Sequence, residues 1–234
     1  MAGLSDSLKW ELKRNPLFED LPENEFNSMI AAATPQVFKT RQRLFNQGDP
    51  GGSLIIILSG RIKVSVVAPN GKDCILSFMG PGDIIGEMTL LDGGPRTADV
   101  EALEATRCLE VARRDFLPLL RRNPDTAIRI IDVLCKRLRA TSQMVEDSAV
   151  LGAAPRLARA LLRLADQHGK SINGKVHIDL PLSQSALGAR AGLLRESVNR
   201  QLRVWEEENI VARDDGHIVL VQPDVLRGVA EDQT

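Results

Sequence analysis

Four short apolar segments between residues 53 and 113 constrain the fold of the first half of the chain most strongly. They read SLIIILSG, RIKVSVVA, DCILSFM and TRCLEVAR, and the glycine-containing turns GDPGG, PNGKD and GPGD lie before, within and after the first three. The triplet PNG between two alternating segments is typical of a β-hairpin. Closely spaced short strands of this kind predict an antiparallel β-barrel or sandwich. Ahead of them, Pro22 and the helical spacing of Phe26, Met29 and Ile30 predict a helix.

From Asp115 onward the pattern becomes helical. A stripe with steps of three and four residues runs along this segment and consists of Ile131, Leu134, Leu138, Thr141 and Val145. Such a heptad stripe either packs on the barrel of its own chain or pairs with the same helix of a second copy. The charged residues on both sides of the stripe favour pairing, so we expect a homodimer. Thr141 is then a polar residue within the dimer seam.

Gly152 and Pro155 interrupt the helical pattern, and Pro155 suits the first turn of a new helix. We therefore expect three parts in an α+β protein. Residues 1–114 hold the N-terminal helices and the β-domain, residues 115–151 the dimerisation helix and hinge, and residues 152–234 a second domain.

The sequence of the second domain predicts both helices and strands. A helix follows Pro155, then a turn with Gly169 and Gly174, a short strand in KVHIDL, two helices, and the ribbon IVARDDGHIVLV. The triplet DDG between two apolar runs is typical of a hairpin turn.

Residues 183–207 have the pattern of a helix-turn-helix motif. Ser183 is a suitable N-cap for the first helix, and Gly192 permits a tight turn before a second helix from about Leu194 to Glu207. The expected buried stripe of the second helix consists of Val198, Leu202 and Trp205.

Polar side chains lie mainly on the other side of this second helix, namely Arg195, Glu196, Asn199, Arg200 and Arg203. Arginine donates a bidentate pair to guanine, and glutamate accepts from cytosine. Residues 183–205 contain four arginines, Arg190 among them, against one glutamate, in a chain of net charge −1. The alternative is a solvated, salt-bridged helix face. The hairpin after this helix, as a wing over a phosphate, favours DNA.

Residues 84–98, IIGEMTLLDGGPRTA, predict an anion site. The guanidinium of Arg96, the hydroxyl of Thr97 and successive backbone N–H groups of a glycine-containing turn match a phosphate. Glu87 only accepts hydrogen bonds, so it suits a sugar hydroxyl, and the pair suggests a nucleotide. The alternative is a structural Arg96–Glu87 salt bridge that closes a barrel loop. The segment matches neither a P-loop nor a dinucleotide fingerprint.

Other functional classes find little support in the residues. Three widely spaced cysteines, Cys74, Cys108 and Cys135, predict buried thiols in a reducing compartment and no metal site or disulfide. Candidate acids, bases and nucleophiles have no visible partners, so we expect no catalytic residues. The longest apolar runs are far shorter than the roughly 20 residues of a membrane span. MAGLSDSLKWELKRN lacks the pattern of a signal peptide, which predicts a cytoplasmic protein.

Three motifs in the right order give the chain a resemblance to a known family. From about residue 15 to 222 it resembles the cyclic-AMP receptor protein/fumarate-nitrate regulator (CRP/FNR) family of bacterial transcription factors. GEMTLLDGGPRTA resembles the phosphate-binding cassette of cyclic-nucleotide domains. KRLRATSQMVEDSAVLGAAPRLARALLRLA, with its Thr-Ser pair, resembles the family's central helix, and LLRESVNR resembles the recognition helix. The resemblance implies a jelly-roll-like antiparallel β-roll that binds a cyclic nucleotide, a long dimerisation helix and a winged helix-turn-helix domain.

The resemblance also implies a ligand site for cyclic AMP or a related cyclic mononucleotide. Gly86, Met88, Arg96 and Thr97 would hold the cyclic phosphate, and Glu87 the ribose 2′-hydroxyl. Thr141 would contact adenine from its own subunit, and Ser142 from the partner subunit. The full implied set is Ser77, Gly86, Glu87, Met88, Arg96, Thr97, Arg137, Thr141 and Ser142.

For DNA, the resemblance implies that Arg195, Glu196 and Arg200 read base edges in a TGTGA-like half-site. Phosphate contacts would come from Ser183, Gln184 and Arg203, with Asn199 on the same surface. RNA polymerase is the further partner that the family implies, through an exposed segment near residues 168–173.

Some alternatives stay open within this family. The regulator could be independent of ligand or respond to cyclic GMP or cyclic-di-GMP. Leu194 stands where the family often has a small capping hydroxyl, so a cap is expected to be missing. Iron–sulfur and haem sensing are not expected, because an N-terminal cysteine cluster is absent and all three histidines lie beyond the hinge.

Overall fold

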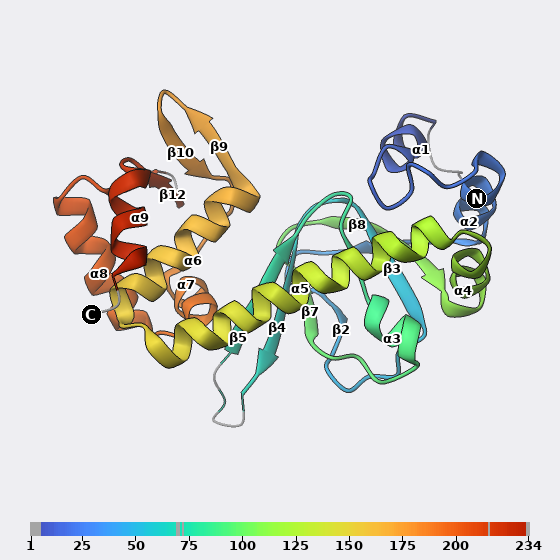
Figure 1. Cartoon of the computed structure of the whole chain (residues 1–234), viewed down its shortest axis with the longest axis horizontal. Helices are drawn as coiled ribbons and strands as arrows, with labels where there is room; N and C mark the ends of the chain where they lie inside the picture. The colour runs from blue at the N-terminus through green and yellow to red at the C-terminus, as the bar shows by residue number, and fades with distance from the viewer. Residues whose placement is uncertain (1–5, 69–70, 72, 215, 233–234) are drawn as a thin grey trace. The chain divides into compact units, whose positions relative to one another are not determined.

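Two four-stranded antiparallel sheets form the β-domain that the sequence predicts for the first half of the chain (Figure 1). The first sheet has the order β1-β8-β3-β6, with bounds Thr34–Phe38, Thr106–Ala112, Ser53–Ser59 and Ile84–Ile85. The second has the order β2-β7-β4-β5, with bounds Arg43–Phe45, Asp99–Ala102, Ile62–Val67 and Asp73–Met79. The predicted α+β class is therefore confirmed.

This computed structural model describes residues 6–68, 71, 73–214 and 216–232. Pro69 and Asn70 of the PNG turn, Asp215 of the DDG turn and the first five residues of the N-terminal segment lie outside the described residues. The chain divides into two compact units, residues 1–66 with 76–139 and residues 67–75 with 140–234. The domain limits expected from the sequence remain predictions.

The central strand β3 is buried on both faces, which explains its uninterrupted apolar sequence. Side chains alternate between the faces of a strand. Ile55 and Ile57 belong to the cluster that joins the two sheets. Leu54 and Ile56 point the other way, into a cluster formed with the helices of the same unit. Each fully buried side chain of this kind stabilises the fold by about 1.5–3 kcal/mol.

Helices cover that second face of β3. They are α1 (Asp6–Lys13), α2 (Glu23–Ala32) and α4 (Arg113–Arg122), each of which contributes side chains to the shared cluster. Pro22 is the N-cap of α2, and the residues predicted for its buried face, Phe26, Met29 and Ile30, are all buried. The predicted helix is thus confirmed.

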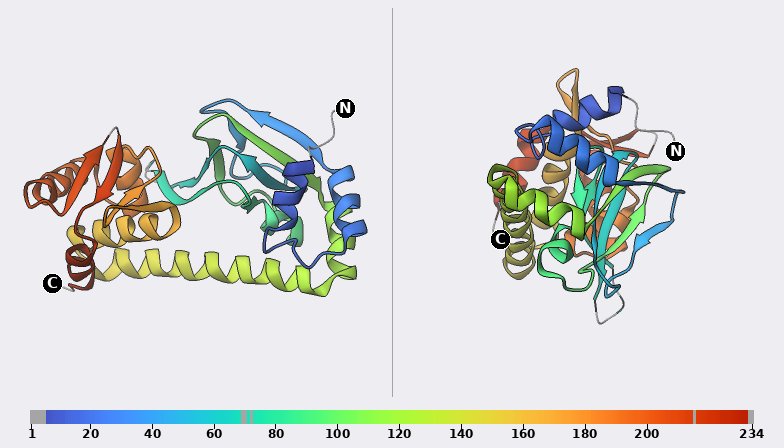
Figure 2. Two further views of the ribbon diagram at one scale, coloured as in Figure 1. Left: turned by 90° about the horizontal axis from the view of Figure 1, so that it is seen from above. Right: turned by 90° about the vertical axis from the view of Figure 1, so that its right-hand side faces the viewer.

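The helix α5 (Pro124–Val150) is the longest helix of the described chain and runs without a break (Figure 2). It ends where Gly152 and Pro155 follow in the sequence, as predicted. Gly152 is the N-cap of α6 (Ala153–His168), and Pro155 lies in its first turn. Near this junction the buried carboxylate of Asp147 forms ion pairs with two arginines of α6. The distances are 2.7 Å from Oδ1 to Nη1 of Arg159 and 2.7 Å from Oδ2 to Nη2 of Arg163.

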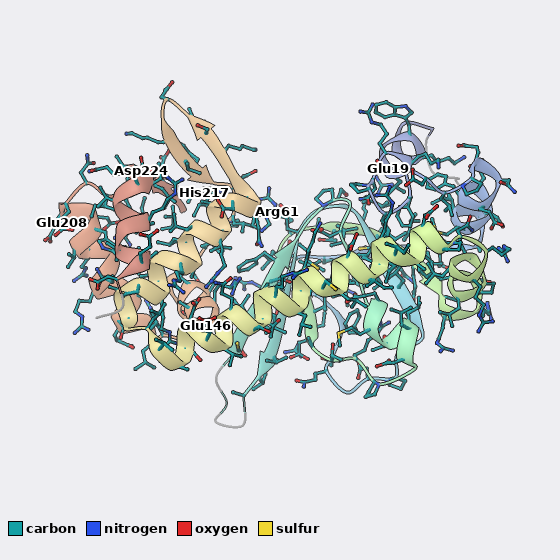
Figure 3. The ribbon with its side chains drawn as sticks, viewed as in Figure 1. Glu19, Arg61, Glu146, Glu208, His217 and Asp224 are labelled. Atoms are coloured by element: carbon teal, nitrogen blue, oxygen red, sulfur yellow. The ribbon has the colours of Figure 1, made fainter. Side chains whose placement is uncertain are left out.

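The second unit packs α6, α7 (Gln184–Ala191), α8 (Arg195–Glu207) and α9 (Pro223–Glu231) beside a small sheet (Figure 3). That sheet has the order β11-β12-β10-β9, with bounds Val211–Asp214, His217–Leu220, Lys175–Ile178 and Gly169–Ile172. The predicted helix pair and the predicted ribbon are confirmed, and the stripe Val198, Leu202 and Trp205 is buried.

The turn predicted at Gly169 is wrong. Gly169 has extended backbone, at φ −83° and ψ 142°, and begins β9. A Cβ atom there would collide with the carbonyl oxygen of Ala165, so the glycine permits a close approach to α6 instead of a turn. The turn lies at Asn173 and Gly174, both with positive φ, and it joins β9 to β10 as a hairpin.

Several short elements had no clear pattern in the sequence. They are β1, β2, β6, β7, α3 (Glu87–Asp92) and α9. Strands β2, β6 and β7 have three, two and four residues, too few to display an alternation.

Candidate nucleotide site and DNA-binding surface

The turn before α3 requires glycine. Gly86 has φ +90°, a left-handed conformation that other residues rarely adopt. A Cβ atom there would also collide with Nη1 of Arg96 and lie 2.7 Å from the carbonyl oxygen of Ser53. The absent side chain therefore lets the backbone and the guanidinium of Arg96 approach each other closely.

Arg96 is 6% exposed and is held by two polar neighbours. Nη1 donates to the carbonyl oxygen of Ser53 at 2.8 Å and to Oγ1 of Thr89 at 3.1 Å, and Nη2 donates to Oγ of Ser53 at 2.9 Å. The ring of Phe45 lies 4.2 Å from Cζ of Arg96. Burial lowers the pKa of Arg96, and nearby carboxylates oppose this shift. The guanidinium remains a cation at neutral pH.

The carboxylate of Glu87 is paired with Arg137 of α5 and not with Arg96. Oε1 of Glu87 forms an ion pair with Nη1 of Arg137, whose Nη2 donates to the carbonyl oxygen of Ile84. The alternative of a Glu87–Arg96 salt bridge is therefore wrong. Glu87 is 2% exposed, and its Oε2 has no hydrogen-bond partner among the described residues. A buried acceptor without a donor is costly, so this atom marks a place for a donating group.

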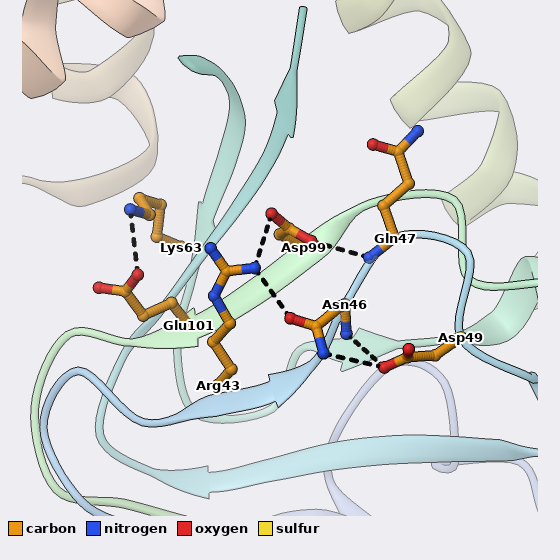
Figure 4. A network of polar contacts seen from close by, with 7 residues as sticks. All are labelled: Arg43, Asn46, Gln47, Asp49, Lys63, Asp99 and Glu101. Atoms are coloured by element: carbon orange, nitrogen blue, oxygen red, sulfur yellow. Dashed lines mark hydrogen bonds and ion pairs between the residues drawn. The ribbon is translucent and has the colours of Figure 1, made fainter. Parts of the chain in front are cut away.

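The loop between β2 and β3 supports the backbone of Arg96, and Figure 4 shows the polar contacts among Arg43, Asn46, Gln47, Asp49 and Asp99 that hold this loop. The N–H of Arg96 donates to the carbonyl oxygen of Asp49, and the N–H of Gly48 donates to that of Arg96, both at 2.8 Å. Asp99 fixes this loop, because its Oδ1 accepts a loop N–H at 2.8 Å and its Oδ2 pairs with Arg43 at 3.0 Å. Sequence reasoning missed these residues, which belong to no recognisable motif.

The structure thus brings Gly86, Glu87, Arg96 and Arg137 together. Thr97 and Met88 are exposed at the same turn, with Oγ1 of Thr97 3.8 Å from the sulfur of Met88. The other residues of the implied ligand set lie on β5 and α5. Ser77 is half-buried on β5. Thr141 and Ser142 are exposed on α5, one helical turn after Arg137. The roles implied for these residues remain predictions.

Most of the predicted seam on α5 faces away from the chain's own core. Ile131, Leu138 and Val145 are 56%, 68% and 64% exposed, and Ile128, which the sequence analysis did not include, is 55% exposed. Leu134 differs, because it is partly buried against the cluster of α2 and α4. An apolar stripe this exposed is available for a second helix.

Tight packing shapes the turn between α7 and α8. Oγ of Ser183 accepts the N–H of Ala186 at 3.1 Å, which confirms the predicted cap. Gly192 has φ +66°, and the carbonyl oxygen of Gly192 accepts from Nη2 of Arg156 at 2.7 Å. Gly188, which the sequence analysis missed, meets the carbonyl oxygen of Leu193 so closely that a Cβ would lie 2.7 Å from it. These contacts fix the angle between the two helices.

The outer face of α8 carries the predicted polar residues. Arg195, Glu196, Arg200 and Arg203 are exposed, opposite the buried stripe. Gln184 of α7 donates to Oδ1 of Asn199 at 3.0 Å, so these two residues hold each other. Leu194 is the N-cap of α8 and makes no side-chain cap hydrogen bond, as expected.

Arg190 does not contribute to the basic surface on which the sequence analysis counted it. It is 3% exposed, and its Nη1 lies 2.8 Å from the sulfur of Met144. Burial, with the charge of Arg163 nearby, lowers the pKa of Arg190 to about 10. Helical periodicity places this residue on the inner side of α7, which a count of charges does not reveal.

Two further predictions concern thiols and other classes of site. Cys108 is buried, and burial raises its pKa to about 12, but Cys74 and Cys135 are only half-buried, so the prediction of buried thiols holds for one residue. Within the described part of the chain no group of three or more His, Cys, Asp or Glu side chains could hold a metal ion. None of the described helices is long and apolar enough to cross a membrane.

Comparisons with known proteins match both units. The family of cyclic nucleotide-binding domains matches residues 35–123, and the Crp-like helix-turn-helix domain matches residues 155–229. The chain is 31% identical over 219 residues to the cyclic AMP receptor protein of Thermus thermophilus, covering 94% of this chain and 98% of that protein. It is 29% identical over 210 residues to a CRP-like cAMP-activated global transcriptional regulator of Mycobacterium tuberculosis, covering 90% and 93%.

A solved structure shares the fold at lower identity. It is the c-di-GMP responsive global regulator CLP of Xanthomonas campestris, with a TM-score of 0.71 and 22% identity, covering 85% of this chain and 99% of that one. Sequence relatives, domain matches and fold agree, so the chain belongs to the CRP/FNR family of transcription regulators, which are DNA-binding proteins and not enzymes.

Proposed function

We propose that this regulator is a homodimer whose affinity for double-stranded DNA rises when it binds a cyclic mononucleotide, with cyclic AMP as the first candidate. The observation that carries the proposal is the buried Oε2 of Glu87, which has no donor among the described residues, near the guanidinium of Arg96. A ribose hydroxyl would donate to the first, and a cyclic phosphate would accept from the second. The names of the two sequence relatives support cyclic AMP. A c-di-GMP responsive regulator has the same fold, so the fold alone does not select the nucleotide.

The dimer would form through the exposed stripe of α5. Ile131, Leu138 and Val145 would pack against the same residues of a second copy. Thr141 is a polar residue in this stripe and weakens it. Adenine bound to Thr141 of one subunit and Ser142 of the other would offset that weakness, so ligand and dimer geometry would be coupled. A ligand shifts such an equilibrium only by its differential affinity for the two states.

The DNA surface would be the outer face of α8. Arg195, Glu196 and Arg200 would contact base edges of a TGTGA-like half-site in the major groove. Contacts to phosphates would come from Ser183, Gln184 and Arg203, with Asn199 holding Gln184 in place. RNA polymerase would be met by the exposed β9–β10 hairpin. A regulator of chromosomal DNA with these partners would act in the cytoplasm.

Fluorescence anisotropy with a labelled TGTGA palindrome tests the proposal. We expect cyclic AMP to tighten binding, and the logarithm of the association constant to fall as the logarithm of salt concentration rises. Calorimetric titrations with cyclic AMP, cyclic GMP and cyclic-di-GMP identify the ligand. Equal DNA affinity with and without each nucleotide would establish the ligand-independent alternative, and absence of DNA binding under every condition would overturn the proposal.

A further inference from the structure

Some of the N–H donors of the Arg96 guanidinium have an acceptor within the protein, and the others do not. A guanidinium has five N–H donors. Three of them are bound by the protein: both hydrogens of Nη1, by the carbonyl oxygen of Ser53 and Oγ1 of Thr89, and one hydrogen of Nη2, by Oγ of Ser53. Nε–H and the second hydrogen of Nη2 have no acceptor among the described residues. These two donors lie on one edge of the planar group, the geometry that binds two oxygens of a phosphate at once.

The other sides of the guanidinium are closed. The ring of Phe45 covers one face, with 4.2 Å between its centroid and Cζ. Gly86 lies so close to Nη1 that a side chain there would displace it. Ser53 is itself 7% exposed and sits at the start of β3, paired with Ala112 of β8, so both of its acceptor atoms are carried by a sheet. Thr89 is 2% exposed, and its hydroxyl donates to the carbonyl oxygen of Gly86 at 3.1 Å.

We infer that Ser53 and Thr89 are positioning residues that hold Arg96 with its Nε/Nη2 edge turned toward a singly charged phosphodiester. This inference rests on the proposed nucleotide site and adds two residues that the cassette motif does not mark. Ser53 satisfies the far end of the guanidinium, so that this end cannot rotate toward the ligand. Thr89 orders the Nη1 side through one hydroxyl that accepts from Arg96 and donates to Gly86.

Titration calorimetry with cyclic AMP compares four variants with the parent. Ser53→Ala removes the bond to Nη2, and Thr89→Val removes a bond to Nη1 at nearly constant volume. We expect each to weaken binding about tenfold, because each loses a charged hydrogen bond that orients the donor edge. Ser53→Thr and Thr89→Ser keep the hydroxyls and should stay close to the parent. Circular dichroism establishes that each variant is folded.

A second readout separates orientation from simple loss of structure. The two phosphorothioate diastereomers of cyclic AMP carry sulfur in place of one or the other exocyclic oxygen. An oriented donor edge discriminates between them, so the parent should bind them with different affinities, and Ser53→Ala should bring the ratio of affinities toward one. A variant that is only less well folded would bind both more weakly at an unchanged ratio.

The outcomes distinguish this inference from the proposed function. A parent that binds no cyclic nucleotide overturns the proposed function, and the inference with it. A parent that binds, together with Ser53→Ala and Thr89→Val variants that keep both its affinity and its diastereomer ratio, overturns the inference alone. Should Ser53→Ala fail to fold, the pair Thr89→Val and Thr89→Ser decides by the same two measurements.

Discussion

Glu87 on α3 and Arg137 on α5 form an ion pair in which the carboxylate is 2% exposed and the guanidinium side chain 28% exposed. One carboxylate oxygen is bound by this arginine, and the other has no donor among the described residues. The same side chain thus joins α5 to the β-domain, and in the proposed function it would also offer an acceptor to the ligand. Since the carboxylate is buried, its ion pair with Arg137 offsets part of the cost of its desolvation.

Replacing Arg137 by alanine should therefore be costly for the fold. The variant leaves a buried carboxylate without its counter-charge, and we expect the free energy of unfolding to fall by about 3 kcal/mol. Urea denaturation followed by circular dichroism measures this. Adding Glu87→Gln to Arg137→Ala should restore part of the loss, because a neutral amide needs no counter-charge. If Arg137→Ala and the double variant are equally stable, the charge of Glu87 does not cause the loss of stability.

Two glycines with left-handed backbone provide a matched pair. Gly86 has φ +90° with Arg96 against it, whereas Gly174 has φ +77° and no described atom within 4 Å of the place of a Cβ. Alanine at either position introduces left-handed strain of about 1–2 kcal/mol. Gly86→Ala should in addition displace Arg96 and reduce cyclic-nucleotide affinity by at least about tenfold, while Gly174→Ala, in the β9–β10 hairpin, should bind like the parent. Calorimetry and thermal unfolding of both variants check this, and similar affinities would mean that Arg96 is not displaced.

The buried cation Arg190 predicts a pH effect. Its pKa is lowered from 12.5 to about 10, so between these values the unfolded chain keeps a proton that the folded chain has released. The contribution of Arg190 to the free energy of unfolding therefore rises with pH in this interval and is a constant cost below it. Replacement by Met should stabilise the protein by about 2 kcal/mol at pH 7.

The stabilisation of Arg190→Met should shrink above about pH 10. Urea unfolding at pH 7, 9 and 11 gives the difference between variant and parent, in which the titration of lysines cancels. The chain contains no tyrosine to complicate the alkaline range. Arg200→Met, at an exposed position, is the control and should show no such dependence. If Arg190→Met raises the free energy of unfolding by the same amount from pH 7 to 11, this would contradict the lowered pKa of Arg190.

On the proposed DNA surface, Arg200 and Arg203 should behave differently. Arg200→Ala should cost about 1–3 kcal/mol of binding to the TGTGA site and relax the base preference there. Arg203→Ala should weaken binding to all sequences equally and lower the salt slope by about one. Arg227→Ala is the control, because that residue pairs with Asp224 on α9. Anisotropy titrations over a range of salt concentrations check these results, and equal behaviour of the three variants would contradict the assignment.

The exposed stripe of α5 predicts an oligomeric state. Leu138→Glu places a charge on the proposed seam, and we expect the parent to sediment as a dimer and the variant as a monomer at micromolar concentration. Val37→Glu, on the edge strand β1, alters a residue of similar exposure, 69% against 68%, and should leave the dimer intact. Sedimentation equilibrium measures both, and a dimeric Leu138→Glu variant would remove the stripe from the interface.

Strong local signals explain which parts of the structure could be predicted. The end of α5 follows from Gly152 and Pro155, and the cap at Ser183 from its hydroxyl, because each acts on neighbouring backbone. β9 was not predicted, because Gly169 was interpreted as a turn residue. In a sequence, a glycine that permits close approach to Ala165 cannot be distinguished from a glycine in a turn. The pairing of Glu87 with Arg137 joins distant segments, and no local rule selects it over the nearer Arg96.

Residues that support others are the least visible in a sequence. Ser53 begins an apolar strand and has the composition of an ordinary strand end, yet both of its acceptors hold Arg96. Asp99 fixes a loop from a strand of only four residues. Arg190 was counted as a surface charge because of its residue type, but its position on the inner side of α7 buries it.

The unbroken course of α5 makes the number of its residues matter as well as their identity. One helix carries both ends of the exposed stripe, and each residue advances an α-helix by about 100° and 1.5 Å. A substitution in the stripe alters one contact. Inserting or deleting a single residue between Ile131 and Leu138 would instead turn Leu138, Thr141 and Val145 by about 100° relative to Ile131, and the apolar stripe would be divided between two faces of the helix.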